Sequence, residues 1–239
     1  MPFGTREIKY RNVAFELELP RASARTVYVR LQSATSLNIK LNLTDNRVFA
    51  GDVIDSQLFF GLYFGAVLIM SLYNFALYLA IRDKSYIYFV TFAMMSGLAF
   101  MYSYGLGFQY LWGGFPQLNG YIGAAVTLIA IGFSTLFTMA YLKLATTAPR
   151  INKIFKFSLI LCFLTLAALP VLGVGRAFIA AGLLVLWFVP LNVAAGVQAI
   201  RKGFGPAKIY LASWIALLLG VLPNFLKNFG IIPANTVTI

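Results

Sequence analysis

Long uncharged apolar stretches constrain the fold of this chain more than any other feature. A helix that crosses a membrane needs about 20 apolar residues, because it rises about 1.5 Å per residue through roughly 30 Å of hydrocarbon. Within lipid such a segment must be helical, so that its own backbone satisfies its hydrogen bonds. The sequence therefore predicts an α-helical polytopic membrane protein. We expect six spanning helices, near residues 58–81, 86–106, 120–142, 155–174, 177–199 and 206–226.

Composition agrees with this prediction and divides the chain in two. Hydrophobic residues make up 60% and charged residues 11%, whereas soluble proteins have about 45–50% and about 25%. Six of the seven acids lie in residues 1–57, and Asp83 is the single acid after them. We expect a transmembrane domain at residues 56–239 and an extracytoplasmic segment at residues 1–55.

The basic residues predict the orientation of the helices. Alternate predicted loops and helix ends hold nine of them: Arg82, Lys84, Lys143, Arg150, Lys153, Lys156, Arg201, Lys202 and Lys208. The other connections after residue 57 hold only Arg176 and Lys227. Because short basic loops stay in the cytoplasm, the amino-terminal segment should lie outside the plasma membrane, which is the inner membrane of a bacterial cell. Most of the net charge of +12 is then a topology signal matched to the anionic inner leaflet, and it does not indicate nucleic-acid binding.

The first 57 residues have a different periodicity. Apolar and polar residues alternate in residues 12–20, 26–32 and 36–43. A period of two indicates half-buried strands, and their spacing suggests a small antiparallel β segment from an incomplete sandwich. Three strands would leave one apolar face uncovered. We therefore expect further strands, and an export signal, to precede Met1.

The order of these segments resembles one family. GLYFGAVLIMSLYNFALYLAIRDKSYIYFVTF, residues 61–92, and RKGFGPAKIYLASW, residues 201–214, are similar to the bacterial seven-transmembrane receptors with diverse intracellular signalling modules. The stretch from PFGTREIKY to SLNIKLNL resembles the last strands of their jelly-roll sensor domain. The resemblance implies a seventh helix beyond this chain.

It also implies the function of a signal-transduction receptor. An extracytoplasmic carbohydrate or other small ligand would shift the helix packing. This shift would regulate a cytoplasmic module of the diguanylate cyclase or histidine kinase type, located in cis beyond this chain. The alternative is a multi-pass transporter or channel for an uncharged solute, although the predicted spans contain no central charges and no internal repeat.

Four residues of the first predicted helix are candidates for special roles. Gly61 and Gly65 have the spacing that allows helix backbones to approach closely. We expect ordinary packing within the bundle, with a homodimer contact as the alternative. Tyr73 and Asn74 lie deep in the same helix, where a polar amide favours an interhelical hydrogen bond over a ligand or switch role.

The fifth predicted helix contains a similar pair, Pro190 and Asn192. Proline leaves a backbone carbonyl without its helical partner, and a nearby amide can satisfy it. The sequence predicts no catalytic residue, cofactor or metal site, because it has no histidine, one cysteine and no acid inside the predicted helices.

Overall fold

Helices account for almost all of the regular structure of this protein. The computed structural model describes residues 3–17, 26–28 and 41–228, with side chains as far as residue 219. The described elements, in chain order, are η1 (Phe3–Thr5), α1 (Asn46–Ile81), α2 (Lys84–Ser103), α3 (Leu106–Tyr110), α4 (Asn119–Tyr141), α5 (Leu144–Thr147), α6 (Pro149–Leu172), α7 (Val174–Arg201) and α8 (Ala207–Asn228).

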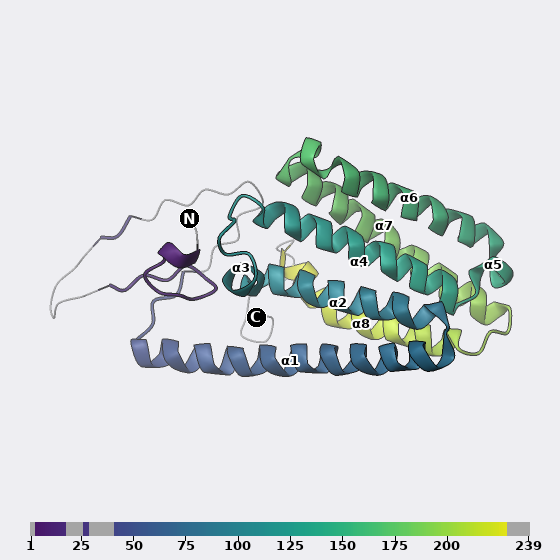
Figure 1. Ribbon diagram of the computed structural model, residues 1–239, viewed down its shortest axis with the longest axis horizontal. Coiled ribbons are helices and arrows are strands. Elements are labelled where there is room, and N and C mark those ends of the chain that lie inside the picture. Colours follow the sequence, from purple (N-terminus) through teal and green to yellow (C-terminus); the bar gives the residue numbers. More distant parts are fainter. Residues whose placement is uncertain (1–2, 18–25, 29–40, 229–239) are drawn as a thin grey trace.

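Five of the described helices are long and apolar enough to cross a membrane, namely α1, α2, α4, α6 and α7. In α8, the described apolar stretch covers only Ala207–Leu219. The helices run side by side along one axis (Figure 1). This arrangement confirms a helical, multi-pass architecture.

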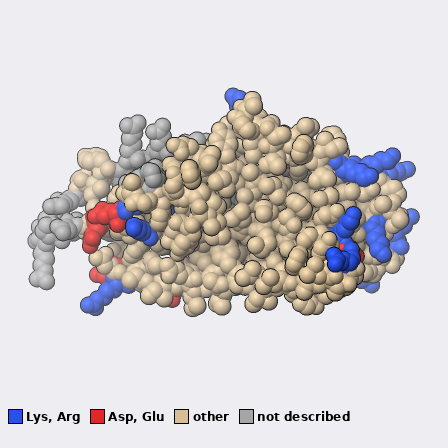
Figure 2. Space-filling model, viewed as in Figure 1, with Lys and Arg blue, Asp and Glu red and all other residues tan. Residues whose placement is uncertain are grey.

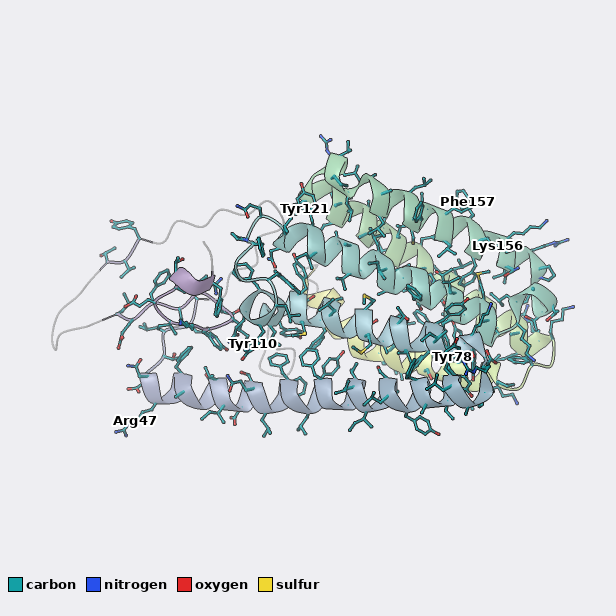
Figure 3. All side chains as sticks on the ribbon, viewed as in Figure 1. Arg47, Tyr78, Tyr110, Tyr121, Lys156 and Phe157 are labelled. Carbon is teal, nitrogen blue, oxygen red and sulfur yellow. The ribbon has the colours of Figure 1, made fainter. Side chains whose placement is uncertain are left out.

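The buried core lies around α4. Half of its membrane-spanning stretch is buried, compared with 6% for α1. The described α4 packs against α2, α6 and α7, whereas α1 packs mainly along α2. Large apolar side chains cover the outside of the bundle, and Figure 3 shows one of them, Phe157, on the outer side of α6. Such a surface would aggregate in water, but it suits a lipid solvent.

The first helix is longer than predicted, because it begins at Asn46 rather than near residue 58. Asp45 accepts a hydrogen bond of 2.8 Å from the backbone N–H of Arg47 and so caps the amino end. At about 1.5 Å per residue, 36 residues span roughly 54 Å, which exceeds the hydrocarbon thickness of about 30 Å. The first turns of α1 extend beyond α2 toward the amino-terminal segment (Figure 1).

The turn between α1 and α2 is tight, as the gap of four residues between the predicted spans 58–81 and 86–106 indicates. Arg82 adopts the left-handed conformation, with φ of 61°, and its N–H donates to the Tyr78 carbonyl. The carboxylate of Asp83 then accepts from the N–H of Ser85 at 2.8 Å and caps α2. Arg82 thus ends α1, and Asp83 caps the start of α2.

Other helix boundaries also differ from the prediction. The second helix ends at Ser103 instead of residue 106, because Gly105 has φ of 74° and interrupts the helical backbone before the short α3. The fourth predicted helix starts earlier, at Pro149, after the short α5. Proline at the first helical position favours that start.

The predicted β segment is not confirmed. Within the described residues, the parts of the three expected strands at 12–17, 26–28 and 41–43 contain no strand. Their remaining residues lie outside the described part of the chain. An isolated strand has no partner for its backbone N–H and C=O groups, so alternation alone does not produce one.

Candidate functional site

The two ends of the bundle differ in charge. Lys and Arg gather at the end that carries the α1–α2 turn, α5 and the α7–α8 turn, whereas Asp and Glu are concentrated near the amino-terminal segment (Figure 2). We call the first the basic end and the second the outer end. Lys156 points toward the basic end, and Arg47 lies at the outer end of α1 (Figure 3). The nine basic residues expected to set the topology belong to elements that meet at the basic end.

At the outer end, the amino-terminal segment lies on the helix bundle. The backbone N–H of Phe3 donates to the carbonyl of Gly113 at 3.0 Å. The ring of Phe3 also packs edge-on against Phe108, with a centroid distance of 6.3 Å. The segment therefore contacts the connection between α2 and α4 both through its backbone and through a side chain.

Two arginines strengthen this contact. The Arg6 guanidinium lies 5.4 Å from the ring centroid of Phe108, and that of Arg11 lies 4.6 Å from the ring centroid of Phe60 on α1. Each cation–π contact contributes about 0.5–1 kcal/mol at exposed sites and about 2 kcal/mol when desolvated. The Arg11 carbonyl also approaches α3 so closely that a Cβ at Gly105 would lie 3.1 Å from it.

Neither guanidinium has a full set of partners. Arg6 donates through Nη1 to the carbonyls of Tyr10 and Arg11. Its Nε, and Nη1 of Arg11, are buried without a hydrogen-bond partner among the described residues. Burial also lowers the pKa of Arg6 from its usual value. Aromatic faces thus replace part of the lost hydration of both cations.

A second polar site lies inside the bundle, where three helices meet. The side-chain oxygen of Asn192 on α7 accepts from Thr138 on α4 at 2.9 Å and from the Tyr210 hydroxyl on α8 at 2.5 Å. The two hydroxyls also lie 2.9 Å from each other. The Asn192 amide donates to the carbonyl of Phe188 one turn earlier at 2.7 Å.

The network is buried and closely packed. Asn192 and Thr138 are fully buried, and Tyr210 is 5% exposed. Next to them, a Cβ added at Gly196 would lie 3.4 Å from the Tyr210 ring, so this glycine lets α7 and α8 approach each other. Since α4, α7 and α8 share one acceptor oxygen, a movement of any one helix must break or rebuild these bonds.

The other candidates from the sequence lie elsewhere. Tyr73 is 65% exposed on the lipid-facing side of α1. The Asn74 amide donates to the Met70 carbonyl of its own helix rather than to a neighbouring helix. In the described part of the chain, no atom of another element lies within 4 Å of a Cβ position at Gly61 or Gly65.

Pro190 stands inside α7, two residues before the network. Proline has no N–H to donate to the Leu186 carbonyl. The Asn192 amide donates to the Phe188 carbonyl and not to the Leu186 carbonyl. Sequence reasoning missed Thr138, Tyr210 and Gly196, because single hydroxyl and glycine residues inside apolar helices have no distinctive pattern. It also missed Arg6 and Arg11, which only the folded chain places over Phe108 and Phe60.

The fold and these sites define a class: a multi-pass membrane protein whose extracytoplasmic segment rests on the outer end of a helix bundle. Residues 56–239 match the family described as 7TM diverse intracellular signalling. Residues 1–45 match the family described as 7TMR-DISM extracellular 2. The chain therefore belongs to the seven-transmembrane receptors with diverse intracellular signalling modules.

This membership makes the chain part of a transmembrane signalling receptor with an extracellular sensor region, and its 7TM domain is of the sensory receptor type. No significant match was found among curated proteins or solved structures.

Proposed function

We propose that this protein senses a ligand outside the membrane and relays its presence through the helix bundle to a cytoplasmic module in cis. The ligand would be a carbohydrate or another small molecule bound by the sensor, with residues 1–55 as its end and residues 56–239 as the transmembrane relay. The output module would be of the diguanylate cyclase or histidine kinase type.

The contact of residues 3–11 with the outer end of the bundle is the observation that supports this proposal. Arg11 lies on Phe60 of α1, and Phe3 is bound to Gly113 in the connection between α2 and α4. A displacement of the sensor would therefore act on α1 and on the connection between α2 and α4 at once. Cations held over aromatic rings with unused donors are cheaper to release than a fully satisfied salt bridge, which suits a contact that must switch.

The buried network supplies a second element of the relay. Thr138, Asn192 and Tyr210 connect α4, α7 and α8, so their hydrogen bonds would favour one packing of the inner helices. A ligand can shift such an equilibrium only as far as its affinities for the two states differ. The network would contribute to the free-energy difference between the two packings. The difference in ligand affinity has to exceed it for the receptor to switch.

A disulfide lock tests the proposal directly. A Cβ built on Gly113 lies 2.8 Å from the Cβ of Phe3, shorter than the roughly 3.5–4.5 Å of a disulfide, and 2.6 Å from the carbonyl oxygen of Phe108, so the backbone around residue 113 must shift for the bond to form. The native Cys162 is buried in α6 and would not compete. In the full-length receptor, oxidised F3C/G113C should lose most of its ligand-dependent change in output, and reductant should restore it.

The single variants F3C and G113C serve as controls, treated with the same oxidant. If the oxidised double variant responds to ligand as strongly as either single variant, the segment does not transmit the signal. The readout is the synthesis of the module's product, measured in membranes with and without ligand.

A further inference from the structure

A cavity of about 460 Å³ lies at the basic end, between α2, α4 and α8. Two charged residues lie at its mouth, Asp83 before α2 and Lys143 after α4. Deeper in, its wall is apolar and aromatic and includes Phe89, Phe137 and Trp214. The volume falls in the range of about 300–1,000 Å³ that is typical of ligand sites.

The charges at the mouth are not paired with each other. No ion pair between Asp83 and Lys143 occurs in the structure, and both residues are exposed. One Asp83 oxygen accepts from the N–H of Ser85, which leaves the carboxylate its negative charge for an outside partner. Asp83 is also the single acid of residues 58–239, so an anionic group at this membrane surface is an exception to the pattern of the whole domain.

The depth of the cavity corresponds to one leaflet. On α2 the lining extends from Ser85 to Phe92, and on α8 it reaches Leu217, ten residues after Ala207. At about 1.5 Å per residue these stretches cover roughly 10–15 Å, about half of the hydrocarbon thickness of roughly 30 Å. An occupant would therefore have its polar group at the cytoplasmic surface and its apolar part in the inner leaflet.

The cavity is also accessible from the lipid. α1 packs mainly along α2 and α8 mainly along α7, and no extensive contact joins α1 to α8 among the described residues. Asn74 of α1 lies on the lining together with residues of α8, so the two helices form its sides. A lipid could enter between them without leaving the membrane.

We propose that this cavity binds a cytoplasmic-leaflet phospholipid whose headgroup carries a primary ammonium next to the phosphate. Asp83 accepts hydrogen bonds from the ammonium, Lys143 donates to the phosphate, and an acyl chain packs against Phe89, Phe137 and Trp214. A purely anionic lipid satisfies Lys143 but faces repulsion from Asp83. A soluble aminophosphate leaves the apolar half unfilled.

The bound lipid would also contact a member of the buried network. Tyr210 lines the cavity, and its hydroxyl donates to Asn192. An acyl chain beside Tyr210 would resist a movement of α8 toward α2. The lipid site goes beyond the receptor function and can be tested without any signalling readout.

Lipid retention by the purified full chain is the measurement. The protein is placed in nanodiscs of phosphatidylethanolamine, phosphatidylcholine or phosphatidylglycerol, released into mild detergent, and weighed by native mass spectrometry. We expect one phosphatidylethanolamine to be retained at least tenfold more than the other two lipids. Asp83→Asn should abolish this preference, because the neutral amide no longer favours the ammonium.

Two further variants keep the test independent of folding defects at the α1–α2 turn. Ser213 is exposed and lines the cavity, so Ser213→Trp should fill it and prevent retention while both charges remain. Lys156→Gln removes one positive charge of the same end without touching the cavity and should retain the lipid normally.

Three results would overturn the proposal. One is equal retention of phosphatidylethanolamine and phosphatidylglycerol by the unmodified protein. Another is full retention by both Asp83→Asn and Ser213→Trp. The third is displacement of the lipid by free phosphoethanolamine at the same molar ratio, because the apolar half of the cavity would then contribute nothing.

Discussion

Replacing Asn192 by Leu should destabilise the bundle through loss of the network between α4, α7 and α8. Leucine has the same branched side-chain skeleton, with methyl groups in place of the amide oxygen and nitrogen, so the fully buried position stays filled and the main change is the loss of hydrogen bonding. The variant removes the acceptor of Thr138 and Tyr210, the only side chains that donate to Asn192 in the described structure. The two hydroxyls keep their mutual contact of 2.9 Å, so one of their protons loses its partner.

The size of the effect follows from this count. Interhelical hydrogen bonds in membranes contribute about 0.6 kcal/mol on average and about 1.7 kcal/mol at most. The two lost interhelical bonds therefore cost roughly 1.2 kcal/mol, and an unsatisfied buried hydroxyl adds about 1 kcal/mol. The variant also loses the bond within α7 from the Asn192 amide to the Phe188 carbonyl, as the Asn74 control loses its bond to the Met70 carbonyl. We expect Asn192→Leu to lower the free energy of unfolding by about 1–3 kcal/mol. Tyr210→Phe removes one of the two bonds and should cost less.

Steric trapping in bicelles measures the free energy of unfolding of each variant. Asn74→Leu is the matched control, because its amide bonds only within α1; its effect should be within about 0.5 kcal/mol. The double variant Asn192→Leu/Tyr210→Phe should cost less than the sum of the single variants, since both remove the same bond. A cost for Asn192→Leu equal to that of the Asn74 control, or strict additivity with Tyr210→Phe, would refute the network as a source of stability.

Three further predictions concern packing, burial and topology. Gly123→Ala should lower the free energy of unfolding by about 1–3 kcal/mol, because the new Cβ would lie 2.4 Å from the Tyr102 ring, whereas Gly182→Ala meets nothing within 4 Å and should be neutral or stabilising. Ser71→Ala should raise the unfolding free energy by about 1 kcal/mol in the same assay, since its buried hydroxyl has no hydrogen-bond partner among the described residues; a loss of stability would reveal a partner. Alkaline phosphatase fused after Lys153 should be inactive, because the basic end faces the cytoplasm, and an active fusion would invert the topology.

Much of the fold could be predicted from the order of apolar and charged residues. The triplet Arg82-Asp83-Lys84 predicts the position of the first hairpin, which the structure confirms, whereas the capping by Asp83 was seen only in the structure. The membrane restricts the chain so strongly that a run of uncharged residues has few alternatives to a helix. Helix ends were less predictable, because Asn46 and Pro149 begin helices outside the apolar runs, where a cap decides the boundary.

The functional residues could be predicted only in part. An amide inside an apolar helix suggests a hydrogen bond, yet Asn74 and Asn192 have the same local signal and different partners. The difference arises from position, since Asn74 lies on the lining of the cavity at the basic end and Asn192 lies where three helices converge. No sequence pattern indicated that Arg6 and Arg11 of the amino-terminal segment would contact the bundle.

The sequence alone therefore determined that this chain crosses the membrane repeatedly, which way it faces and where its first turn falls. These properties depend on the free energy of transferring each segment from water to lipid, which the residues of that segment determine by themselves. Only the tertiary structure decided that Thr138, Asn192 and Tyr210 meet, that Arg11 rests on Phe60, and that a cavity opens at the basic end. Such contacts depend on how helices distant in sequence pack together, because lipid leaves the choice of neighbours to close packing and a few hydrogen bonds.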